Sequence, residues 1–423
     1  MRKRLLVLFV AALLLAGCAA QDIPDATEEQ IQYDWMAGEC PLSIRRTGMV
    51  NAGMNFSDFE VTGDGTYFIY QHPYYSINRP FLSPVILYAD HGSDTLIKLC
   101  GRADCTHSTE DCDAYIFKGA QIVCYDGYLY AIEGDSSGGM PSAKCKLLRM
   151  DADGTNRVEV LNLLQFAQRN GYTNVSNSTI TNGVGIFGMT YYEPQPDGTS
   201  MQYVEHYYYK LDGSMEEPKP MGGEGYFLYS CGDVFLNYGE AQNGGEYGGY
   251  YDWDPETNTT TFLTDHPGTA GWYGKEEGYY FKNGALHRLT YATGETEILL
   301  DTGLEGNYDA IFFPDCIVVS SKDGESTPDN NLYIYNWAYE LVDTVEIDYY
   351  PFGWDLDLEL ILAETSERFI LANSPYGMPQ YYINKSELGT GNVSIHEFKM
   401  PDLADELEYY EEEFADLEWF ENG

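Results

Sequence analysis

The sequence predicts an all-β fold, a β-propeller with seven four-stranded blades, and a short acidic helix after it. Three observations lead to this expectation. The 423 residues include 38 tyrosines, which suit half-buried strands, and 43 glycines, which suit a chain with many tight turns. From about residue 54 onward a unit of four short apolar strands recurs. Its third-to-fourth-strand turns lie 38 residues (Glu256 to Gly294) to 62 residues (Gly92 to Gly154) apart, which is typical of propeller blades.

The turns of the seven units are rich in Asp, Asn and Gly, which tight hairpins need. Their centres are Gly92, Gly154, Gly213, Glu256, Gly294, Tyr339 and Gly389. A single four-stranded sheet of this size cannot bury both faces, whereas sheets stacked around an axis bury both and shorten their exposed edges. A β-sandwich does not predict seven copies of one unit, and a solenoid repeat would be shorter. Six or eight blades stay open as alternatives.

This rhythm over residues 54–400, with Asp-Gly turns such as DADGTN and KLDGS, resembles that of TolB-like and related uncharacterised propellers of secreted bacterial proteins. The resemblance implies the same fold and an extracytoplasmic location, and it implies no particular activity. The units lack the combined GH…WD signature that marks WD40 blades.

The N-terminus reads as an export signal. Three basic residues at positions 2–4 precede an apolar run over residues 5–15, which is too short to span a bilayer stably. The following Leu15-Ala16-Gly17-Cys18 resembles the lipobox of bacterial lipoproteins. That resemblance implies removal of residues 1–17, lipidation of Cys18, and an anchor on the outer face of the cytoplasmic membrane, as in Gram-positive lipoproteins. The alternative is an ordinary signal peptide with a chance cysteine.

The charge limits the classes of partner. The chain has 23 Lys and Arg against 67 Asp and Glu, a formal net charge of −44, yet 44% of its residues are hydrophobic, enough for a sizeable core. Nucleic acid is excluded as a partner because phosphate binding needs clustered basic residues. The same acidity opposes adsorption to anionic membranes, so the lipid anchor is the only membrane contact that we expect. A protein or a glycan is the expected partner.

One stretch, CGRADCTHSTEDC, concentrates soft metal ligands. It places Cys100, Cys105, His107 and Cys112 within thirteen residues, and four such ligands can wrap one tetrahedral zinc ion. The spacing is not that of common zinc knuckles. The stretch resembles a segment of uncharacterised propeller lipoproteins of anaerobic gut Firmicutes, a resemblance that implies no activity. Since all four ligand positions would be filled, we expect a structural and not a catalytic zinc. No other cofactor is required.

A disulfide is the competing interpretation, and free thiols are the third. Apart from Cys18, eight cysteines remain, an even number that is compatible with bridges outside the cytoplasm. Three cysteines in one loop would leave an odd one, which Cys40 or Cys124 could take. Against full oxidation, Cys231 and Cys316 lie in apolar strands, as buried thiols do. Zinc or a disulfide would each make the stretch a clip on the connector between the first two blades.

Aromatic side chains beside carboxylates suggest where a ligand could stack. The candidates are Tyr250, Tyr251, Trp253, Trp272, Tyr273 and Trp354; the alternative for all of them is packing between blades. We find no set of catalytic residues at a spacing that a known mechanism requires. The expected function is therefore that of a non-catalytic binding or scaffold protein. The alternative is a glycan-active enzyme, a propeller-type lyase or hydrolase.

The expected organisation has four parts. Residues 1–17 are the signal peptide, 18–48 a polar, acidic tether, 49–400 the propeller, and 401–423 an acidic amphipathic tail. In the tail, apolar residues recur at helical spacing from Leu403 to Phe420, and Pro401 and Asp402 suit a helix start. The tail either lies on the propeller or binds a partner.

Overall fold

The structure is a computed structural model, and the part of the chain that it describes consists of residues 36–42, 59–61, 65–70, 85–105, 112–116, 121–134, 144–196, 198–240, 248–265, 271–306, 308–321, 331–347, 361–372 and 379–401. The expected signal peptide, most of the expected tether, and residues 402–423 with the expected tail helix lie outside the described residues. No helix in the described part is long and apolar enough to cross a bilayer.

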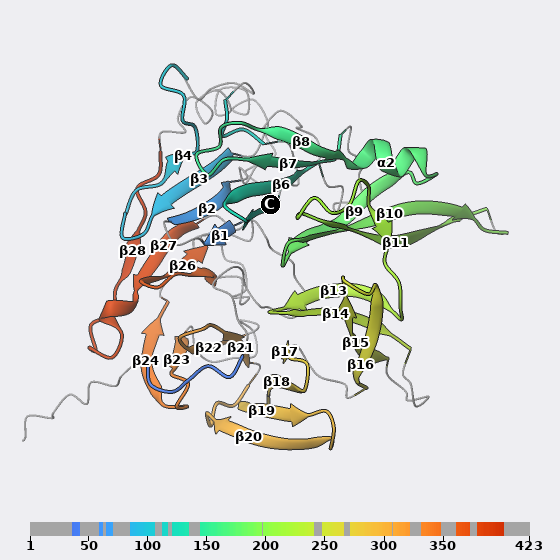
Figure 1. Cartoon of the computed structure of the whole chain (residues 1–423). Coiled ribbons are helices and arrows are strands. Elements are labelled where there is room, and N and C mark those ends of the chain that lie inside the picture. The colour runs from blue at the N-terminus through green and yellow to red at the C-terminus, as the bar shows by residue number, and fades with distance from the viewer. Residues whose placement is uncertain are drawn as a thin grey trace, which may run out of the picture.

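Seven antiparallel four-stranded sheets surround a common axis, so the predicted seven-bladed propeller is confirmed (Figure 1). Each sheet is built from four consecutive strands. The first three blades contain β1 (Phe59–Val61), β2 (Gly65–Tyr70), β3 (Val85–Asp90) and β4 (Ile97–Lys98); β5 (Gln121–Tyr125), β6 (Tyr128–Glu133), β7 (Lys146–Met150) and β8 (Val158–Asn162); and β9 (Asn174–Thr181), β10 (Val184–Pro194), β11 (Ser200–Lys210) and β12 (Lys219–Pro220).

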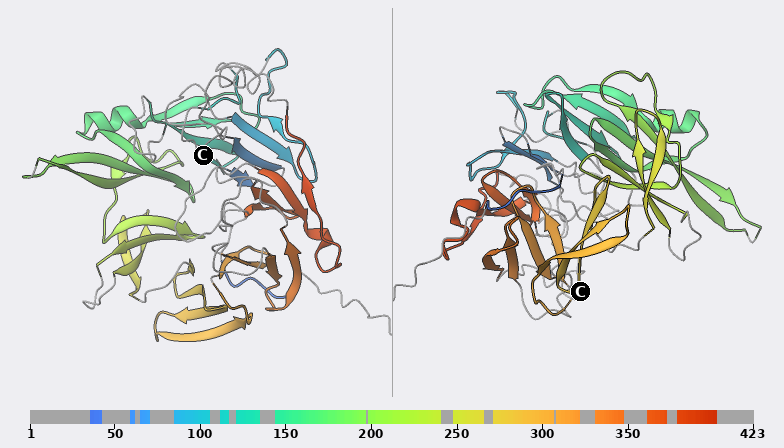
Figure 2. Two further views of the ribbon diagram at one scale, coloured as in Figure 1. Left: turned by 180° about the vertical axis from the view of Figure 1, so that it is seen from behind. Right: turned by 60° about the horizontal axis from the view of Figure 1, so that its bottom comes forward.

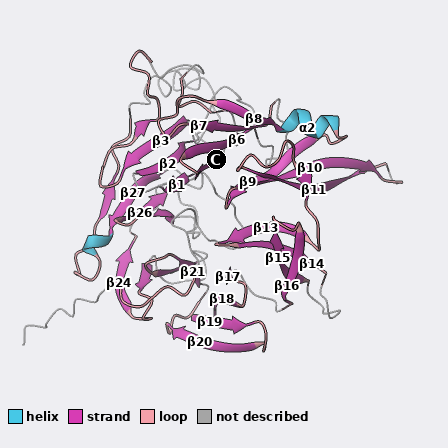
Figure 3. Ribbon diagram, viewed as in Figure 1, coloured by secondary structure: helices cyan, strands magenta, loops and turns pink. Residues whose placement is uncertain are grey.

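The remaining four blades repeat this arrangement. They contain β13 (Tyr226–Cys231), β14 (Val234–Gly239), β15 (Gly249–Asp254) and β16 (Thr259–Thr264); β17 (Gly271–Tyr273), β18 (Glu277–Lys282), β19 (Ala285–Thr290) and β20 (Glu295–Asp301); β21 (Tyr308–Phe312), β22 (Ile317–Ser321), β23 (Asn331–Tyr335) and β24 (Leu341–Glu346); and β25 (Ile361–Glu364), β26 (Arg368–Ala372), β27 (Pro379–Asn384) and β28 (Ile395–Glu397). Helix is confined to α2 (Leu163–Arg169), between blades two and three, and the short η2 (Lys385–Glu387) within the described residues (Figure 3).

The core lies between the blades. One buried cluster joins blades one and two, a second joins two, three and four, a third joins four, five and six, a fourth joins six and seven, and a fifth joins seven and one. Phe68 of blade one, for example, shares its cluster with Ile370 of blade seven. Because each sheet is covered on both faces by its neighbours, the apolar strands need no separate core.

Among the described strands, none is shared between blades seven and one, where the ring closes. The N–H of Leu96 donates to the carbonyl of Lys399 (2.9 Å), and the N–H of Lys399 donates to the carbonyl of Asp94 (2.7 Å). The guanidinium of Arg368 on β26 reaches across the same joint to the carbonyls of Gly92 and Ser93. Figure 2 shows the two blades side by side from two further directions.

The end of the expected tether contacts the propeller. The N–H of Ala338 in blade six donates to the carbonyl of Ala37 (3.1 Å). Gly38 adopts a φ of +88°, and a Cβ there would lie 2.2 Å from the carbonyl carbon of Trp337. Close backbone approach therefore requires glycine at this position, and residues 36–42 belong to the folded domain.

Candidate functional site

The structure brings three of the four predicted metal ligands together. Cys100 lies two residues after the end of β4, Cys105 ends the next turn, and Cys112 lies three residues before Tyr115, which bridges to Val85 of β3. Their sulfur atoms all lie within 4.8 Å of one another. Cys112 is buried, and Cys100 and Cys105 are half-buried. His107, the fourth predicted ligand, lies outside the described residues.

Backbone bonds hold these thiols in place from both sides. The N–H of Cys105 donates to the carbonyl of Arg102 (3.2 Å), which closes the turn, and the N–H of Tyr115 donates to the carbonyl of Cys112 (3.0 Å). Leu96 and Phe398 belong to the apolar cluster behind the sulfurs. Hydrogen bonds and apolar packing therefore fix the positions of the three cysteines, as a preformed set of ligands requires.

The charged neighbours of the cluster are Arg102 and Asp113. Nη2 of Arg102 donates to Sγ of Cys105 at 3.3 Å, and its Nε lies 3.5 Å from Oδ2 of Asp113. Hydrogen bonds to Cys105 and Cys100 raise the pKa of Arg102. Burial raises the pKa of the Cys112 thiol to about 12. An unliganded Cys112 therefore keeps its proton at neutral pH and reacts slowly as a nucleophile.

The predicted stacking aromatics are mostly in the core, which corrects that prediction. Tyr251, Trp253, Trp272 and Tyr273 are each less than 10% exposed: 3%, 0%, 2% and 6%. Tyr250 is half-buried and stacks on Tyr273 with ring centroids 4.8 Å apart. Trp253 packs in the cluster of blades two, three and four, whereas Tyr250, Trp272 and Tyr273 pack in the cluster of blades four, five and six. Trp354 lies outside the described residues.

Exposed tyrosines lie at Tyr128, Tyr192 and Tyr226, and Tyr192 is on the hairpin of β10 and β11, which projects from the ring (Figures 1 and 2). β9 pairs with β10 only from Val184 to Thr190, and β12 pairs with β11 only at Tyr207 and Tyr208. Residues 191–194 and 200–203 pair with each other beyond the sheet. We call residues 191–194 and 200–206 the ribbon.

One face of the ribbon carries a row of tyrosines. Tyr191 and Tyr203 lie directly opposite one another, with ring centroids 5.3 Å apart and planes inclined by 17°. Tyr172, just after α2, meets Tyr191 edge-on at 6.0 Å and donates its hydroxyl to the carboxylate of Glu205. Met201 on this face is 53% exposed, and Tyr192 on the opposite face is 50% exposed. Large exposed side chains mark interaction surfaces.

The length of the hairpin explains why this surface projects. Its two arms are eleven residues each, whereas the inner strands of the other blades have five or six. A hairpin of that length must extend beyond its neighbours. Tyr172 and Glu205 join the surface only through the fold, because α2 brings Tyr172 beside β11.

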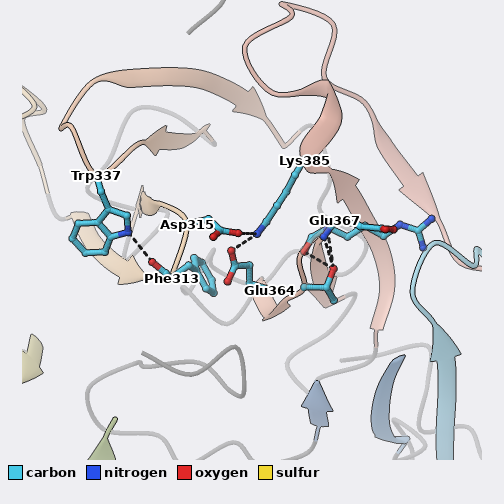
Figure 4. A network of polar contacts seen from close by, with 8 residues as sticks. Phe313, Asp315, Trp337, Glu364, Glu367 and Lys385 are labelled. Atoms are coloured by element: carbon cyan, nitrogen blue, oxygen red, sulfur yellow. Dashed lines mark hydrogen bonds and ion pairs between the residues drawn. The ribbon is translucent and has the colours of Figure 1, made fainter. Parts of the chain in front are cut away.

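A buried ion-pair network lies between blades six and seven (Figure 4). Lys385, only 1% exposed, donates to Oδ2 of Asp315 at 2.9 Å and pairs with the buried carboxylate of Glu364. Beside it, Trp337 donates its Nε1–H to the carbonyl of Phe313 at 3.0 Å. Both carboxylates pair with the ammonium group of Lys385, so we interpret the network as structural and not catalytic.

The described fold defines the class of this protein as a seven-bladed β-propeller. No protein-family model matches the chain, and no curated protein matches it. Solved structures similar to it include the β-propeller domain of the trilobed protease from Pyrococcus furiosus. The two are 9% identical with a TM-score of 0.31, and the match covers 72% of this chain and 99% of that one.

Two glycan-active proteins are among the similar structures. Oligogalacturonate lyase from Vibrio parahaemolyticus is 12% identical over 56% of this chain and 71% of that one, with a TM-score of 0.31. The α-L-arabinanase of Penicillium chrysogenum, solved with arabinobiose, is 12% identical over 82% of this chain and 96% of that one, with a TM-score of 0.28. These likenesses concern the fold and not the activity.

Proposed function

We propose that this chain is a lipid-anchored extracytoplasmic β-propeller that works as a non-catalytic binding or scaffold protein. The observation that carries the proposal is the ribbon, a two-stranded projection with the exposed Tyr192, two half-buried tyrosines and an open edge. Tyrosine gives a large contact area at a small cost in side-chain entropy, which is why it is enriched in interfaces. The lipobox resemblance of Leu15 to Cys18 supports the location.

The open edge of the ribbon belongs to β11. The carbonyl of His206 accepts a hydrogen bond from the N–H of Met221 on this side, and peptide groups two residues apart point the same way. The peptide groups of Gln202 and Val204 therefore face this edge, where no strand of the described residues pairs with them. At the opposite edge Pro194 offers no N–H, which discourages pairing.

An extended segment of a partner protein fits this edge. It would add a strand beside β11, with its backbone bonded to Gln202 and Val204 and alternate side chains beside Tyr203. Glu193 and Glu205 are exposed on the ribbon, and the chain carries a net charge of −44. This charge favours a partner segment with Lys or Arg and opposes pairing between two copies of the chain.

Photo-crosslinking in producing cells tests the binding surface. A photoreactive residue at Tyr192 is expected to give a discrete adduct, whereas one at Ile298, which is 58% exposed on β20, gives none. Sensitivity of the adduct to proteases or to glycosidases separates a protein partner from a glycan. Equal labelling at both positions would contradict the binding role, as would turnover of polysaccharides by the purified chain.

The anchor has a separate test. In Cys18→Ser the lipid attachment site is absent, so we expect the protein to appear in the medium and not in the membrane fraction. Cys40→Ser keeps the signal and serves as the matched control, which stays with the membrane. Membrane retention of the Cys18→Ser chain would contradict lipidation at this residue.

A further inference from the structure

The three sulfur atoms of Cys100, Cys105 and Cys112 are close to the arrangement that one metal ion requires. They lie within 4.8 Å of one another. Around a tetrahedral zinc with zinc–sulfur bonds of about 2.3 Å, sulfurs are about 3.8 Å apart, so the cluster would contract by about an ångström or less. A disulfide joins only two sulfurs, at about 2.05 Å, and gives no reason for the third to converge on the same point.

We propose that Cys100, Cys105 and Cys112 bind one zinc ion, which clips the connector between blades one and two. Binding would release the three thiol protons to solvent as three thiolates coordinate the ion. Thiolates select zinc and other soft ions and reject calcium and magnesium, which prefer oxygen. The proposal stands independently of which partner the ribbon binds.

The charge around the cluster suits this ion. One Zn²⁺ with three thiolates carries a net charge of −1, and the guanidinium of Arg102 lies 3.3 Å from Sγ of Cys105. Arg102 is held in turn by Asp113, whose Oδ2 is 3.5 Å from its Nε. Partners of this kind orient metal ligands and balance their charge.

Asp113 is also a described candidate for the fourth ligand. Its Oδ2 lies 3.9 Å from Sγ of Cys100. The sequence offers His107 as the other candidate. A site with four protein ligands is closed and structural, whereas a site that keeps a water in the fourth position can act on a substrate.

The place of the cluster explains what the clip would do. Beyond Cys112 the chain lies along β3, where the N–H of Ile86 donates to the carbonyl of Ala114 (2.8 Å). From the β7–β8 turn of blade two, Arg157 donates to the carbonyls of Asp113 and Tyr115. In the same turn a Cβ on Gly154 would lie 2.8 Å from the carbonyl of Leu99. A metal ion would therefore fix the segment through which blade two contacts blade one.

The test begins with metal content. We expect the full mature chain, purified without chelator, to contain about one zinc per chain, and Cys105→Ser to contain about tenfold less. Cys124→Ser is the matched control, a half-buried cysteine on β5 outside the cluster, and it keeps its zinc. Asp113→Asn and His107→Gln compare the two candidates for the fourth ligand. We expect zinc to be lost in the variant whose replaced residue is that ligand.

A second measurement covers a variant that fails to fold. In the wild-type chain, a zinc chelator is expected to release the ion and to make three further thiols reactive toward an alkylating agent. Replacement of the ion by Co²⁺ then gives the charge-transfer absorption of thiolate ligands. A wild-type chain without metal would overturn the proposal. So would zinc retained in Cys105→Ser, or a mass of the wild-type chain that is lower by two hydrogen atoms because two of the three cysteines form a disulfide.

Discussion

At the scale of single residues, the network of Lys385, Asp315 and Glu364 shows how the propeller buries charged side chains by pairing them. Lys385 follows β27 of blade seven, Glu364 ends β25 of the same blade, and Asp315 lies in the β21–β22 turn of blade six. Lys385 and Glu364 are each 1% exposed. A charge removed from water in this way is costly unless a partner of opposite sign remains beside it. The network therefore fixes how blade six meets blade seven.

Lys385→Met tests this interpretation. The substitution leaves the carboxylate of Glu364 buried without its lysine, so the free energy of unfolding is expected to fall by about 3–5 kcal/mol. The double variant Lys385→Met/Glu364→Gln removes the buried charge as well, and it should recover most of the loss. Denaturant titrations of the wild type and the single and double variants measure both changes.

A surface pair provides the control for that experiment. Lys275 and Asp233 lie 3.6 Å apart and are 59% and 60% exposed, and such pairs contribute about 0–1 kcal/mol. Lys275→Met should therefore leave the unfolding midpoint nearly unchanged. If Lys385→Met behaved like Lys275→Met, the network would not be structural.

At the scale of elements, the sequence predicted the turns well because their chemistry is local. Six of the seven expected turn centres adopt a positive φ, including Gly154 at +83° and the non-glycine Tyr339 at +64°. In blade four the centre expected at Glu256 has its positive φ two residues later, at Asn258. Asn tolerates this conformation nearly as well as Gly, whereas Glu does not.

The aromatic prediction was wrong for a reason that belongs to the fold. Alternation along a strand tells which side chains share a face, but not whether that face is covered. In a propeller both faces of a sheet are covered by neighbouring blades, so Trp253 and Trp272 are buried although they lie near carboxylates in the sequence. The ribbon escapes this because it extends beyond its neighbours, and Tyr192 is exposed.

The thiol cluster was predicted less completely than the turns and better than the aromatic residues. Its short spacing predicted that Cys100, Cys105 and Cys112 would converge, and their sulfur atoms do. The contribution of Arg102 could not be predicted, because several side chains in that loop could equally approach a sulfur. Whether zinc binds there stays a prediction.

At the scale of the whole molecule, the repeat gave the number of blades but not the way in which the ring closes. Closure depends on contacts between residues about 275 positions apart, such as those of Arg368 with Ser93 and Gly92. No local pattern encodes such a contact. Blade seven is completed by its own strand β28, so side chains and a short backbone contact carry the joint to blade one.

Arg368 is the central side chain of this joint. Its Nη2 donates to the carbonyl of Gly92 at 2.9 Å, its Nε donates to Oδ1 of Asn384 at 3.2 Å, and its guanidinium carbon lies 4.1 Å from the ring centroid of Tyr382. A planar fork of donors stacked on an aromatic ring is a geometry that lysine cannot reproduce. Both Arg368→Met and Arg368→Lys should therefore weaken closure.

The free energy of opening the joint is expected to fall by roughly 1.5–3 kcal/mol, the range for hydrogen bonds to charged groups. The effect should appear first at the joint and not across the whole molecule. Because the joint links blades one and seven, hydrogen exchange of amides in β3 and β26 should accelerate, while exchange in β14 and β18 across the ring stays unchanged. Arg169→Met is the control, since Arg169 pairs with Glu217 on the surface and both are more than half exposed. If exchange accelerated equally in all blades, the ring would open as one unit and Arg368 would not act as its clasp.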